Sequence, residues 1–339
     1  MTPPERRGAR ALQLLLGLAI TAALVLWAFR NVRFAEVWST IRTVRILPML
    51  LAVAVATIPF ALRVPRWRLL LRHDDDRPLP SGPLWHAIAI GFAANNVLPL
   101  RAGEVLRVGA VSRLARVSFA AALSSVAVER VIDALTVVAL LSVGLVAAHL
   151  PSTVSLGGTT PVTVVAQRTG IVCLAALLVA IAAAWRRDLA LQLFERLLPS
   201  GRIGAAIVRF VDRVLSGFGA LRDPRRALPV IGWSFIIWTV NAAAFFLAFK
   251  AFNFPVPFTG ALILQGGLMI GIAVPSTPGY AGTFEAAIVA ALALYGIAAA
   301  PALAYAVTYH LTTFIPITAL GALSAIRTGT RLRTPTVAP

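Results

Sequence analysis

The chain interrupts its apolar pattern at residues 95–107, which read NNVLPLRAGEVLR. Pro99 and Gly103 disfavour an unbroken helix there. Charged residues follow at three-residue steps, as Arg101, Glu104 and Arg107. A charged side chain near the centre of a bilayer costs about 2.5–3.5 kcal/mol on insertion scales, and broken backbone at that depth needs a protein or polar surrounding. The stretch therefore predicts a polar site inside a membrane protein.

The composition independently indicates a membrane protein. Of the 339 residues, 59% are hydrophobic and 13% are charged, which excludes an ordinary soluble protein. The net charge of +18 is also typical of nucleic-acid binding, but the arginines gather at the ends of apolar runs, where they suit anionic lipid headgroups. We therefore expect membrane lipids, and not nucleic acid, as partners.

The apolar runs predict an all-α polytopic membrane protein with about six full transmembrane helices. We expect these helices at residues 11–29, 46–62, 119–148, 162–184, 227–249 and 302–326. The first is long for a signal peptide and lacks a small-residue cleavage site, so we interpret it as retained. The second is followed by RVPRWR, residues 63–68, whose arginines and Trp67 fit a cytoplasmic membrane boundary.

Two shorter apolar segments, residues 84–116 and 258–297, are broken near their middle and predict re-entrant helical hairpins. Two tilted full helices are the alternative for the first. Residues 46–148 and 227–326 both read helix, hairpin, helix, in opposite orientations. Interrupted segments at corresponding positions of two inverted repeats indicate a transporter-type site between the repeats.

We expect one transmembrane domain over residues 1–339, with residues 162–226 linking the two repeats. This link comprises a helix and an arginine-rich amphipathic segment that fits the cytoplasmic membrane surface. Most of the 31 Lys and Arg residues fall on the cytoplasmic side when both termini are placed there. The sequence thus predicts a multi-pass plasma (inner) membrane protein with cytoplasmic termini.

Charged residues at membrane depth are the candidates for substrate binding. They are Arg101, Glu104, Arg107, Glu129, Arg130, Asp133 and Glu285. Neighbours at steps of three or four residues can meet on one helical face. One interpretation is a structural ion-pair network that holds broken helices together. The other is an anion site, since a guanidinium grips a phosphate through two parallel hydrogen bonds.

Polar and backbone-shaping residues complete the candidate site. Asn95 and Asn96 can cap freed backbone groups or contact a headgroup. His310 can titrate near neutral pH or be a satisfied interior histidine. The residues expected to shape the backbone are Pro99, Gly103, Pro275, Pro278, Gly279 and Gly282.

Motifs of soluble enzymes are missing from the sequence. It contains no glycine-rich phosphate loop after a strand, no metal-type Cys/His spacing and no G-x-S-x-G nucleophile turn. We therefore assign no catalytic residue, no metal and no cofactor. An intramembrane enzyme that uses Glu104 or Glu129 stays open as an alternative.

Two stretches resemble a known family. NNVLPLRAGEVLR with AALSSVAVERVIDAL (residues 95–107 and 121–135), and VPSTPGYAGTFEAAIVAALALYGI (residues 274–297), resemble the signatures of the lysylphosphatidylglycerol synthase transmembrane region family, also called flippase-like or UPF0104 proteins. RVPRWRLLL matches the R-x-x-R-W tendency of that family. The chain departs from it at His310, where many members have arginine.

The resemblance implies an integral inner-membrane protein of lipid biology. In two-part members of the family this module is associated with moving an aminoacylated lipid, which a separate soluble domain makes. The sequence printed here has no segment that is long and polar enough for such a domain, so we do not carry the synthase activity over.

We therefore expect a flippase-like protein that translocates or binds an anionic or polyprenyl-phosphate-type lipid through a charged intramembrane cavity. Two alternatives remain open. In the first, the chain is a non-transporting membrane partner of a lipid synthase or glycosyltransferase. In the second, it is an intramembrane lipid-modifying enzyme.

Overall fold

The computed structural model describes residues 33–73, 77–98, 102–150, 161–186, 192, 201, 224–273 and 278–333. Within these ranges the regular elements are helices, apart from one isolated bridge between Arg72 and Pro78. The predicted all-helical class is therefore confirmed for the part of the chain that the structure describes. The expected first helix, residues 11–29, and most of the amphipathic segment before residue 224 lie outside these ranges.

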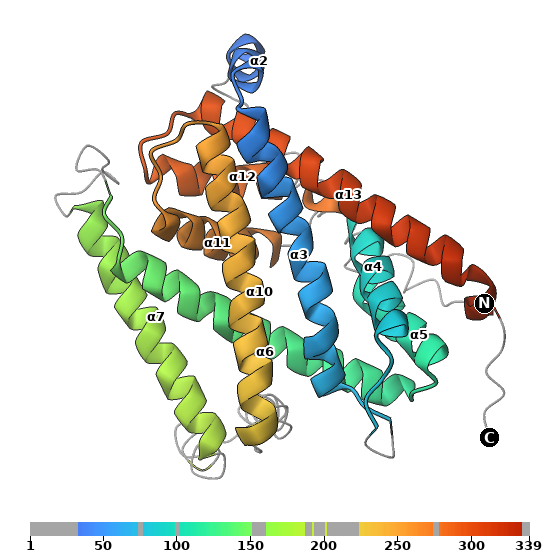
Figure 1. Cartoon of the computed structure of the whole chain (residues 1–339). Helices are drawn as coiled ribbons and strands as arrows, with labels where there is room; N and C mark the ends of the chain where they lie inside the picture. The colour runs from blue at the N-terminus through green and yellow to red at the C-terminus, as the bar shows by residue number, and fades with distance from the viewer. Residues whose placement is uncertain are drawn as a thin grey trace.

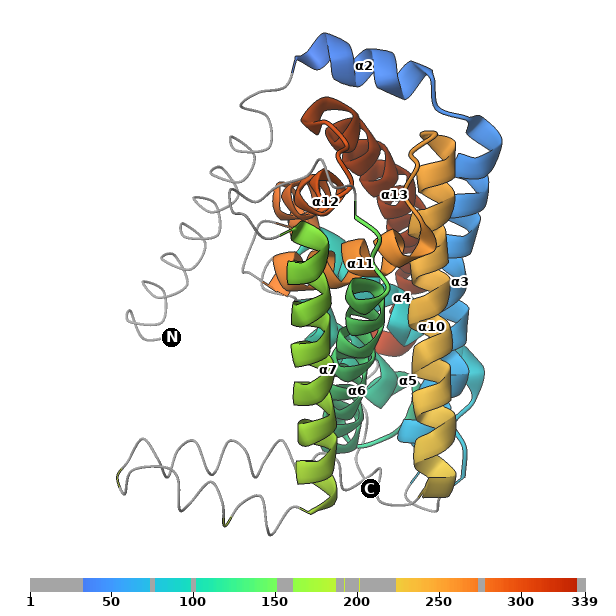
Figure 2. The same cartoon turned by 90° about the vertical axis from the view of Figure 1, so that its left-hand side faces the viewer.

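Three helices are long and apolar enough to cross a membrane. They span Ile46–Leu70, Ala227–Ala251 and Ala299–Gly329. These stretches belong to α3 (Ile46–Leu70), α10 (Pro224–Ala251) and α13 (Ala299–Arg333). Figures 1 and 2 show α3 and α10 side by side along much of their length, with α13 crossing the bundle obliquely.

The remaining helices pack around this frame. They are α2 (Phe34–Arg42), α4 (Ser81–Val97), α5 (Ala102–Ala115), α6 (Phe119–Val146), α7 (Val162–Trp185), α11 (Phe258–Ala273) and α12 (Thr283–Ala293). α6 packs against α7 and α11, while α4 packs against α5 and α13. α2 lies across one end of the bundle (Figure 2). A helix is present at each described position where one was predicted, and three of these helices are long and apolar enough to cross a membrane.

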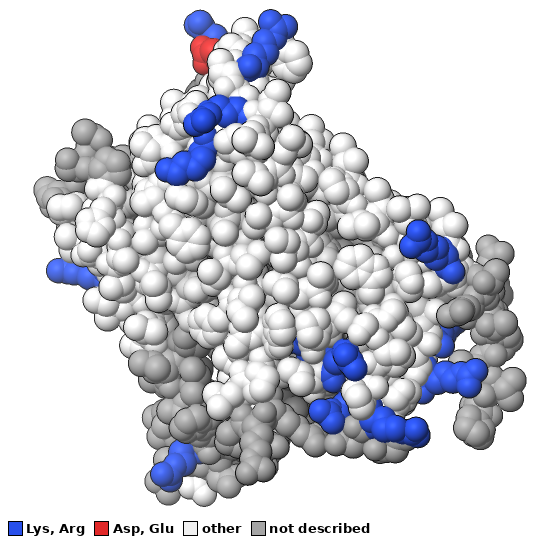
Figure 3. All heavy atoms as spheres, viewed as in Figure 1, with Lys and Arg blue, Asp and Glu red and all other residues white. Residues whose placement is uncertain are grey.

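The surface charges match a membrane environment. Figure 3 shows Lys and Arg side chains gathered toward the two ends of one face, with a broad uncharged surface between them. Large apolar side chains such as Leu47, Leu50 and Ile315 are exposed. In a bilayer such side chains face lipid tails, so they need no protein partner.

The backbones of α4 and α5 lie unusually close together at Gly91 and Gly103. A Cβ at Gly103 would lie 2.0 Å from the backbone oxygen of Gly91. Only glycine permits this contact, so the start of α5 can press directly against α4.

The second broken pair, α11 and α12, is joined through a short 3₁₀ turn, η2 (Pro278–Tyr280). Gly279 and Gly282 have φ of 70° and 83°, and Tyr280 has a φ of 59°. This left-handed backbone is easy for glycine and strained for tyrosine. The turn therefore reverses the chain within a few residues.

Aromatic side chains fill the core of the second half. Phe249 and Tyr305 lie 5.3 Å apart between ring centroids, and Tyr305 and Tyr309 stack with centroids 5.9 Å apart. The hydroxyl of Tyr305 donates a hydrogen bond to the backbone oxygen of Phe245. These contacts fix α10 against α13.

One predicted boundary is wrong. We expected the second helix to end at residue 62, with RVPRWR as a cytoplasmic flank. Instead α3 continues through Pro65 to Leu70, and Arg63, Arg66 and Trp67 are buried. An internal proline costs a helix roughly 3 kcal/mol, but here the arginines beside it are engaged with carboxylates of another helix. Trp67 is consequently a core residue and not an interfacial anchor.

Candidate functional site

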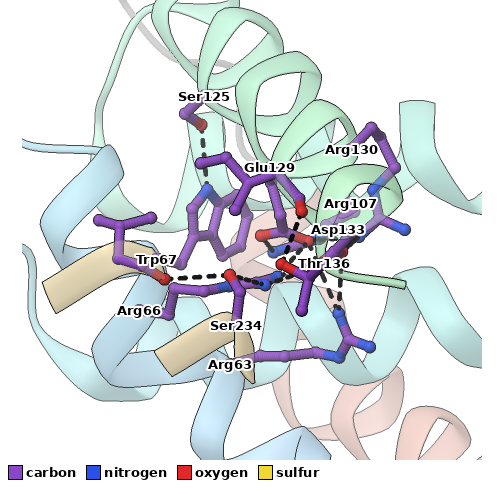
Figure 4. Close-up of polar contacts among 12 residues, drawn as sticks. Arg63, Arg66, Trp67, Arg107, Ser125, Glu129, Arg130, Asp133, Thr136 and Ser234 are labelled. Carbon is purple, nitrogen blue, oxygen red and sulfur yellow. Dashed lines mark hydrogen bonds and ion pairs between the residues drawn. The ribbon is translucent and has the colours of Figure 1, made fainter. Parts of the chain in front are cut away.

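Seven charged side chains meet where α3, α5 and α6 come together, and α10 closes the group from one side (Figure 4). We call this group the arginine–carboxylate cluster. Its members are Arg63, Arg66, Glu104, Arg107, Glu129, Arg130 and Asp133.

Glu129 is at the centre of the cluster and is fully buried. Arg107 donates to both of its carboxylate oxygens, over 2.7 and 2.9 Å. A nitrogen of Arg66 lies 3.2 Å from Oε1, and Arg130 also donates to this oxygen. A forked pair of this kind is the strongest common side-chain hydrogen bond. The carboxylate is therefore stabilised by three guanidinium groups.

Asp133, one turn further along α6, is the second buried acceptor. Arg66 donates to it, and so does the indole nitrogen of Trp238 over 2.9 Å. A nitrogen of Arg130 lies 3.2 Å away and one of Arg63 lies 3.5 Å away. The i, i+4 spacing of the two acids lets one helix present both to the same arginines.

The buried arginines are fixed by further contacts. Arg66 also donates to the hydroxyl of Ser234 over 2.9 Å. The guanidinium of Arg107 lies 3.8 Å from the ring centroid of Trp67, whose indole nitrogen donates to Ser125 over 3.0 Å. Stacking on an aromatic face is favourable for guanidinium. These contacts define the positions of both groups.

Arg130 and Glu104 form the accessible edge of the cluster. Their side chains are 37% and 29% exposed, whereas those of Glu129 and Arg66 are fully buried. A nitrogen of Arg130 lies 3.7 Å from Glu104 Oε1. A molecule approaching the cluster would therefore meet this pair first.

A second polar centre joins α12 to α13. Glu285 Oε2 accepts a hydrogen bond from the backbone N–H of Gly282 over 2.7 Å, and Glu285 Oε1 lies 2.7 Å from His310 Nδ1. His310 stacks on Phe284 with ring centroids 4.2 Å apart and meets Phe314 edge to face. This centre thus ties the turn after α11 to the long last helix.

Two asparagines at the end of α4 contact α5 and α13. Asn95 Oδ1 accepts a hydrogen bond from the N–H of Gly103 over 2.9 Å, and Asn96 Nδ2 donates to Thr318 over 2.9 Å. The Cβ position of Gly279 lies 3.2 Å from the backbone oxygen of Asn96. Both asparagines therefore make contacts within the protein, and Asn95 acts as a cap.

Most of the predicted binding residues fall into these centres. Glu104, Arg107, Glu129, Arg130 and Asp133 meet in the cluster, while Glu285 and His310 form the second centre. Arg101, Pro99 and Pro275 lie outside the described residues. Among the described residues no group of three His, Cys, Asp or Glu is arranged to hold a metal ion.

The sequence reasoning missed Arg63 and Arg66. The signal was present, because R-x-x-R places two guanidinium groups on one helical face, and two acids at membrane depth need cations. This stretch also matches the R-x-x-R-W tendency of the family. It was instead interpreted as a loop flank, since arginines at the end of an apolar run are usually cytoplasmic.

Comparisons with known proteins identify the family of the chain. A family model described as the lysylphosphatidylglycerol synthase TM region matches residues 14–321. The chain is also similar to the glycosyltransferase AglD of Haloferax volcanii, with 28% identity over 294 residues. The matched region is 78% of this chain and 46% of AglD, so the chain spans about half the length of that relative.

Proposed function

Because the chain belongs to the lysylphosphatidylglycerol synthase transmembrane region family, we propose that it translocates a membrane lipid with an anionic phosphate headgroup, of the polyprenyl-phosphate type among others. The arginine–carboxylate cluster is the headgroup site in this proposal. The observation that carries it is a set of four arginines around two buried carboxylates, with Arg130 partly exposed at the edge.

Energetics favour a functional role for such a cluster. Replacing a buried ion-pair group by well-packed apolar side chains is often neutral or stabilising by 1–4 kcal/mol. A chain that only needed packing at this position would gain nothing from seven charged residues. Arginine is also suited to grip phosphate through two parallel hydrogen bonds.

The proposed topology has six full spans and two re-entrant hairpins, arranged as inverted repeats in one transmembrane domain. The hairpins are α4 with α5 and α11 with α12, each a pair of short helices joined at a break rich in glycine and proline. Both termini lie in the cytoplasm, and the membrane is the inner membrane. A site between such repeats is the usual arrangement in secondary transporters.

The second polar centre has a separate role in this proposal. Glu285 and His310 hold the second hairpin against α13, and the hairpin moves when they part. The N–H groups of Gly103 and Gly282, at the starts of α5 and α12, already donate to Asn95 and Glu285. The proposal requires no catalytic residue.

Similarity to AglD supports a second candidate function. That relative is named a glycosyltransferase and is about twice as long as the matched region. The chain would then be the membrane partner of a separate glycosyltransferase or lipid synthase, which it anchors beside its lipid substrate. This role predicts a stable complex and no lipid movement by the chain alone.

Lipid scrambling in proteoliposomes tests the proposal. We expect the purified chain to move tail-labelled anionic lipids between leaflets, and Arg130→Gln to slow this at least about tenfold, since a hydrogen bond to a charged group contributes about 1.5–3 kcal/mol. Arg42→Gln is the matched control, because Arg42 is exposed on α2. Equal rates for the two variants would reject the cluster as the lipid path, and no movement of any lipid would favour the anchoring role.

A further inference from the structure

The second polar centre differs from the arginine–carboxylate cluster in the chemistry of its cation. Glu129 and Asp133 each have a guanidinium nitrogen 3.2 Å away, and guanidinium groups stay protonated in proteins. Glu285 instead lies 2.7 Å from an imidazole nitrogen, Nδ1 of His310. Histidine is the side chain that ordinarily gains and loses a proton between about pH 5 and pH 8. The charge of the second polar centre can therefore change with pH, whereas the guanidinium charges are fixed.

Both partners of this contact are held in position by other groups. Glu285 Oε2 accepts a hydrogen bond from the backbone N–H of Gly282, so Oε1 is the oxygen that faces His310. The imidazole stacks on Phe284 and meets the ring of Phe314 edge to face. The side chains of Glu285 and His310 keep 11% and 16% of their surface exposed. The pair is therefore ordered and still within reach of a proton.

Charged groups on the other helices that pack against α13 have partners of their own. These pairs are Arg42 with Trp38 (α2), Arg63 with Asp133 (α3), Arg107 with Glu129 (α5) and Lys250 with Phe246 (α10). His86 of α4 lies beyond Gly321, away from His310, because Ala89 and Ala93 already meet Gly321. The neighbours Tyr280 and Tyr309 carry phenols, which ordinarily stay neutral below about pH 10. Among the described residues, the charge beside His310 is therefore that of Glu285.

The turn between α11 and α12 connects the second polar centre to the end of α4. The Cβ position of Gly279 lies 3.2 Å from the backbone oxygen of Asn96. It also lies 3.0 Å from Cε2 of Phe314, the ring that meets His310. Asn96 Nδ2 in turn donates to Thr318 of α13 over 2.9 Å. A displacement of the turn therefore reaches the end of α4.

The same end of α4 caps the start of α5 beside the cluster. Asn95 Oδ1 accepts a hydrogen bond from the N–H of Gly103 over 2.9 Å. The next residue, Glu104, belongs to the accessible edge of the cluster, where its Oε1 lies 3.7 Å from a nitrogen of Arg130. Asn95 and Asn96 are neighbours, and they contact α5 and the turn respectively. They provide a contiguous route between the two centres, of the kind that carries energetic coupling.

We propose that Glu285 and His310 bind one proton, and that this proton is coupled to the binding of an anionic headgroup at the arginine–carboxylate cluster. The inference rests on the proposed function, because it names the ion that accompanies lipid at that site. The N–H of Nδ1 faces the carboxylate, so the proton adds at Nε2. The pair then changes from one negative charge to none.

Electrostatics give the sign of this coupling. A neutral pair repels an anion less than a negative one does, so proton uptake favours headgroup binding. By linkage, headgroup binding favours proton uptake by the same factor. One proton carried with one anionic headgroup also cancels the charge that crosses the low-dielectric centre of the bilayer, where an isolated charge is costly.

Nuclear magnetic resonance of the histidine rings tests the proton site without any lipid movement. The sequence has four histidines, and the ¹⁵N ring signals that vanish in His310→Gln identify those of His310. We expect these signals, from the full chain in phosphatidylcholine nanodiscs, to report proton uptake between about pH 8 and pH 5. Glu285→Gln should change the pH at which this happens. No uptake in this range, or the same response in Glu285→Gln, would overturn the proposal.

Lipid binding at two pH values tests the coupling. The probe is tail-labelled phosphatidylglycerol, a diester that keeps one negative charge at both about pH 5.5 and about pH 8. We expect wild type to bind it at least about fivefold more tightly at the lower pH. In Glu285→Gln and His310→Gln the difference should fall below about twofold. His149→Gln, at an exposed histidine, is the matched control and should behave as wild type. Equal binding by wild type at both pH values, or a full difference in His310→Gln, would refute the coupling.

Asn95 tests the route between the centres as a positioning residue. Asn95→Ala removes the cap on Gly103, and it should leave the ring response of His310 to pH intact while reducing the pH dependence of lipid binding. Asn95→Ser keeps a side chain that can cap a helix and should restore part of that dependence. The thermal unfolding midpoint checks that both variants are folded. A full pH dependence of binding in Asn95→Ala would exclude this route.

The two proposals fail in different ways. Lipid movement in liposomes, with binding that ignores pH, would refute the proton coupling and leave translocation standing. Binding that depends on pH through His310, without any lipid movement, would support the coupling and refute translocation.

Discussion

Arg66 of α3 donates a hydrogen bond to Asp133 of α6, and neither side chain is more than slightly exposed. Each group would be an isolated charge without the other. The pair also includes Ser234 and Trp238 of α10, which bond to Arg66 and Asp133 respectively. The pair therefore joins side chains from three helices.

Removing one partner of this pair should destabilise the chain strongly. We expect Asp133→Asn to lower the free energy of unfolding by about 3–5 kcal/mol, because Glu129 is then the one fully buried carboxylate left to the arginines of the cluster. Unfolding in a denaturing detergent, followed by circular dichroism, measures this. Glu36→Gln on the exposed helix α2 serves as control and should change little. A loss of under 1 kcal/mol for Asp133→Asn would show that Arg66 finds other compensation.

Glycine at position 103 should be essential for the α4–α5 contact. A Cβ there would lie 2.0 Å from Gly91 O and 2.5 Å from Asn95 Oδ1, so Gly103→Ala must push α5 away from α4. We expect a large drop in the yield of folded protein on size-exclusion chromatography. Gly109→Ala is the matched control on the same helix, since no atom lies within 4 Å of its Cβ. That variant should be neutral or more stable by about 0.5–1 kcal/mol. Equal yields would contradict the close approach.

Trp67 should matter both for packing and for the position of Arg107. Trp67→Ala removes a fully buried side chain and is expected to cost about 3–5 kcal/mol. Trp67→Phe keeps an aromatic face beneath Arg107 but loses the hydrogen bond to Ser125, so it should cost less. Thermal unfolding of the two variants checks this order. A larger loss for Trp67→Phe would mean that stacking contributes little.

His310 makes two contacts, a hydrogen bond with Glu285 and a stack on Phe284, and variants should separate their effects. His310→Phe keeps the stack on Phe284 and leaves Glu285 Oε1 without this partner. His310→Gln keeps a donor for Glu285 and loses the stack. We expect His310→Phe to reduce lipid scrambling more than His310→Gln, because an unpaired buried carboxylate oxygen weakens the α12–α13 contact by about 1–3 kcal/mol. The opposite order would assign the role to the stacked ring.

Much of the fold follows from local patterns that the sequence displays. Apolar runs bounded by Pro, Gly and Arg locate the helices within a few residues, because burial in lipid and helix-breaking residues act locally. The end of α3 was misplaced for the converse reason. Whether Arg63 and Arg66 face water or a carboxylate depends on α6, which lies more than fifty residues away.

The candidate site was predictable in its residues but not in its pairing. Glu129 and Asp133 stand out because acids at membrane depth are expensive. Their partners come from three other helices, and no spacing rule selects between helices. Glu285 and His310 were both singled out, yet their contact arises from how α12 packs on α13. Asn95 is different, since capping of a freed backbone group was one of its two interpretations, and the structure shows this group to be the N–H of Gly103.

The density of bonds around Glu129 has a mechanical consequence. Sliding α3, α5 or α6 against another would separate several opposite charges at once, where the dielectric constant is low and the cost is high. These helices therefore form a stiff block. Near the turn at Pro278–Tyr280 the polar link to α13 is the contact between Glu285 and His310, which involves one carboxylate and no arginine. In the proposed translocation, helix movement would therefore leave α3, α5 and α6 fixed relative to one another.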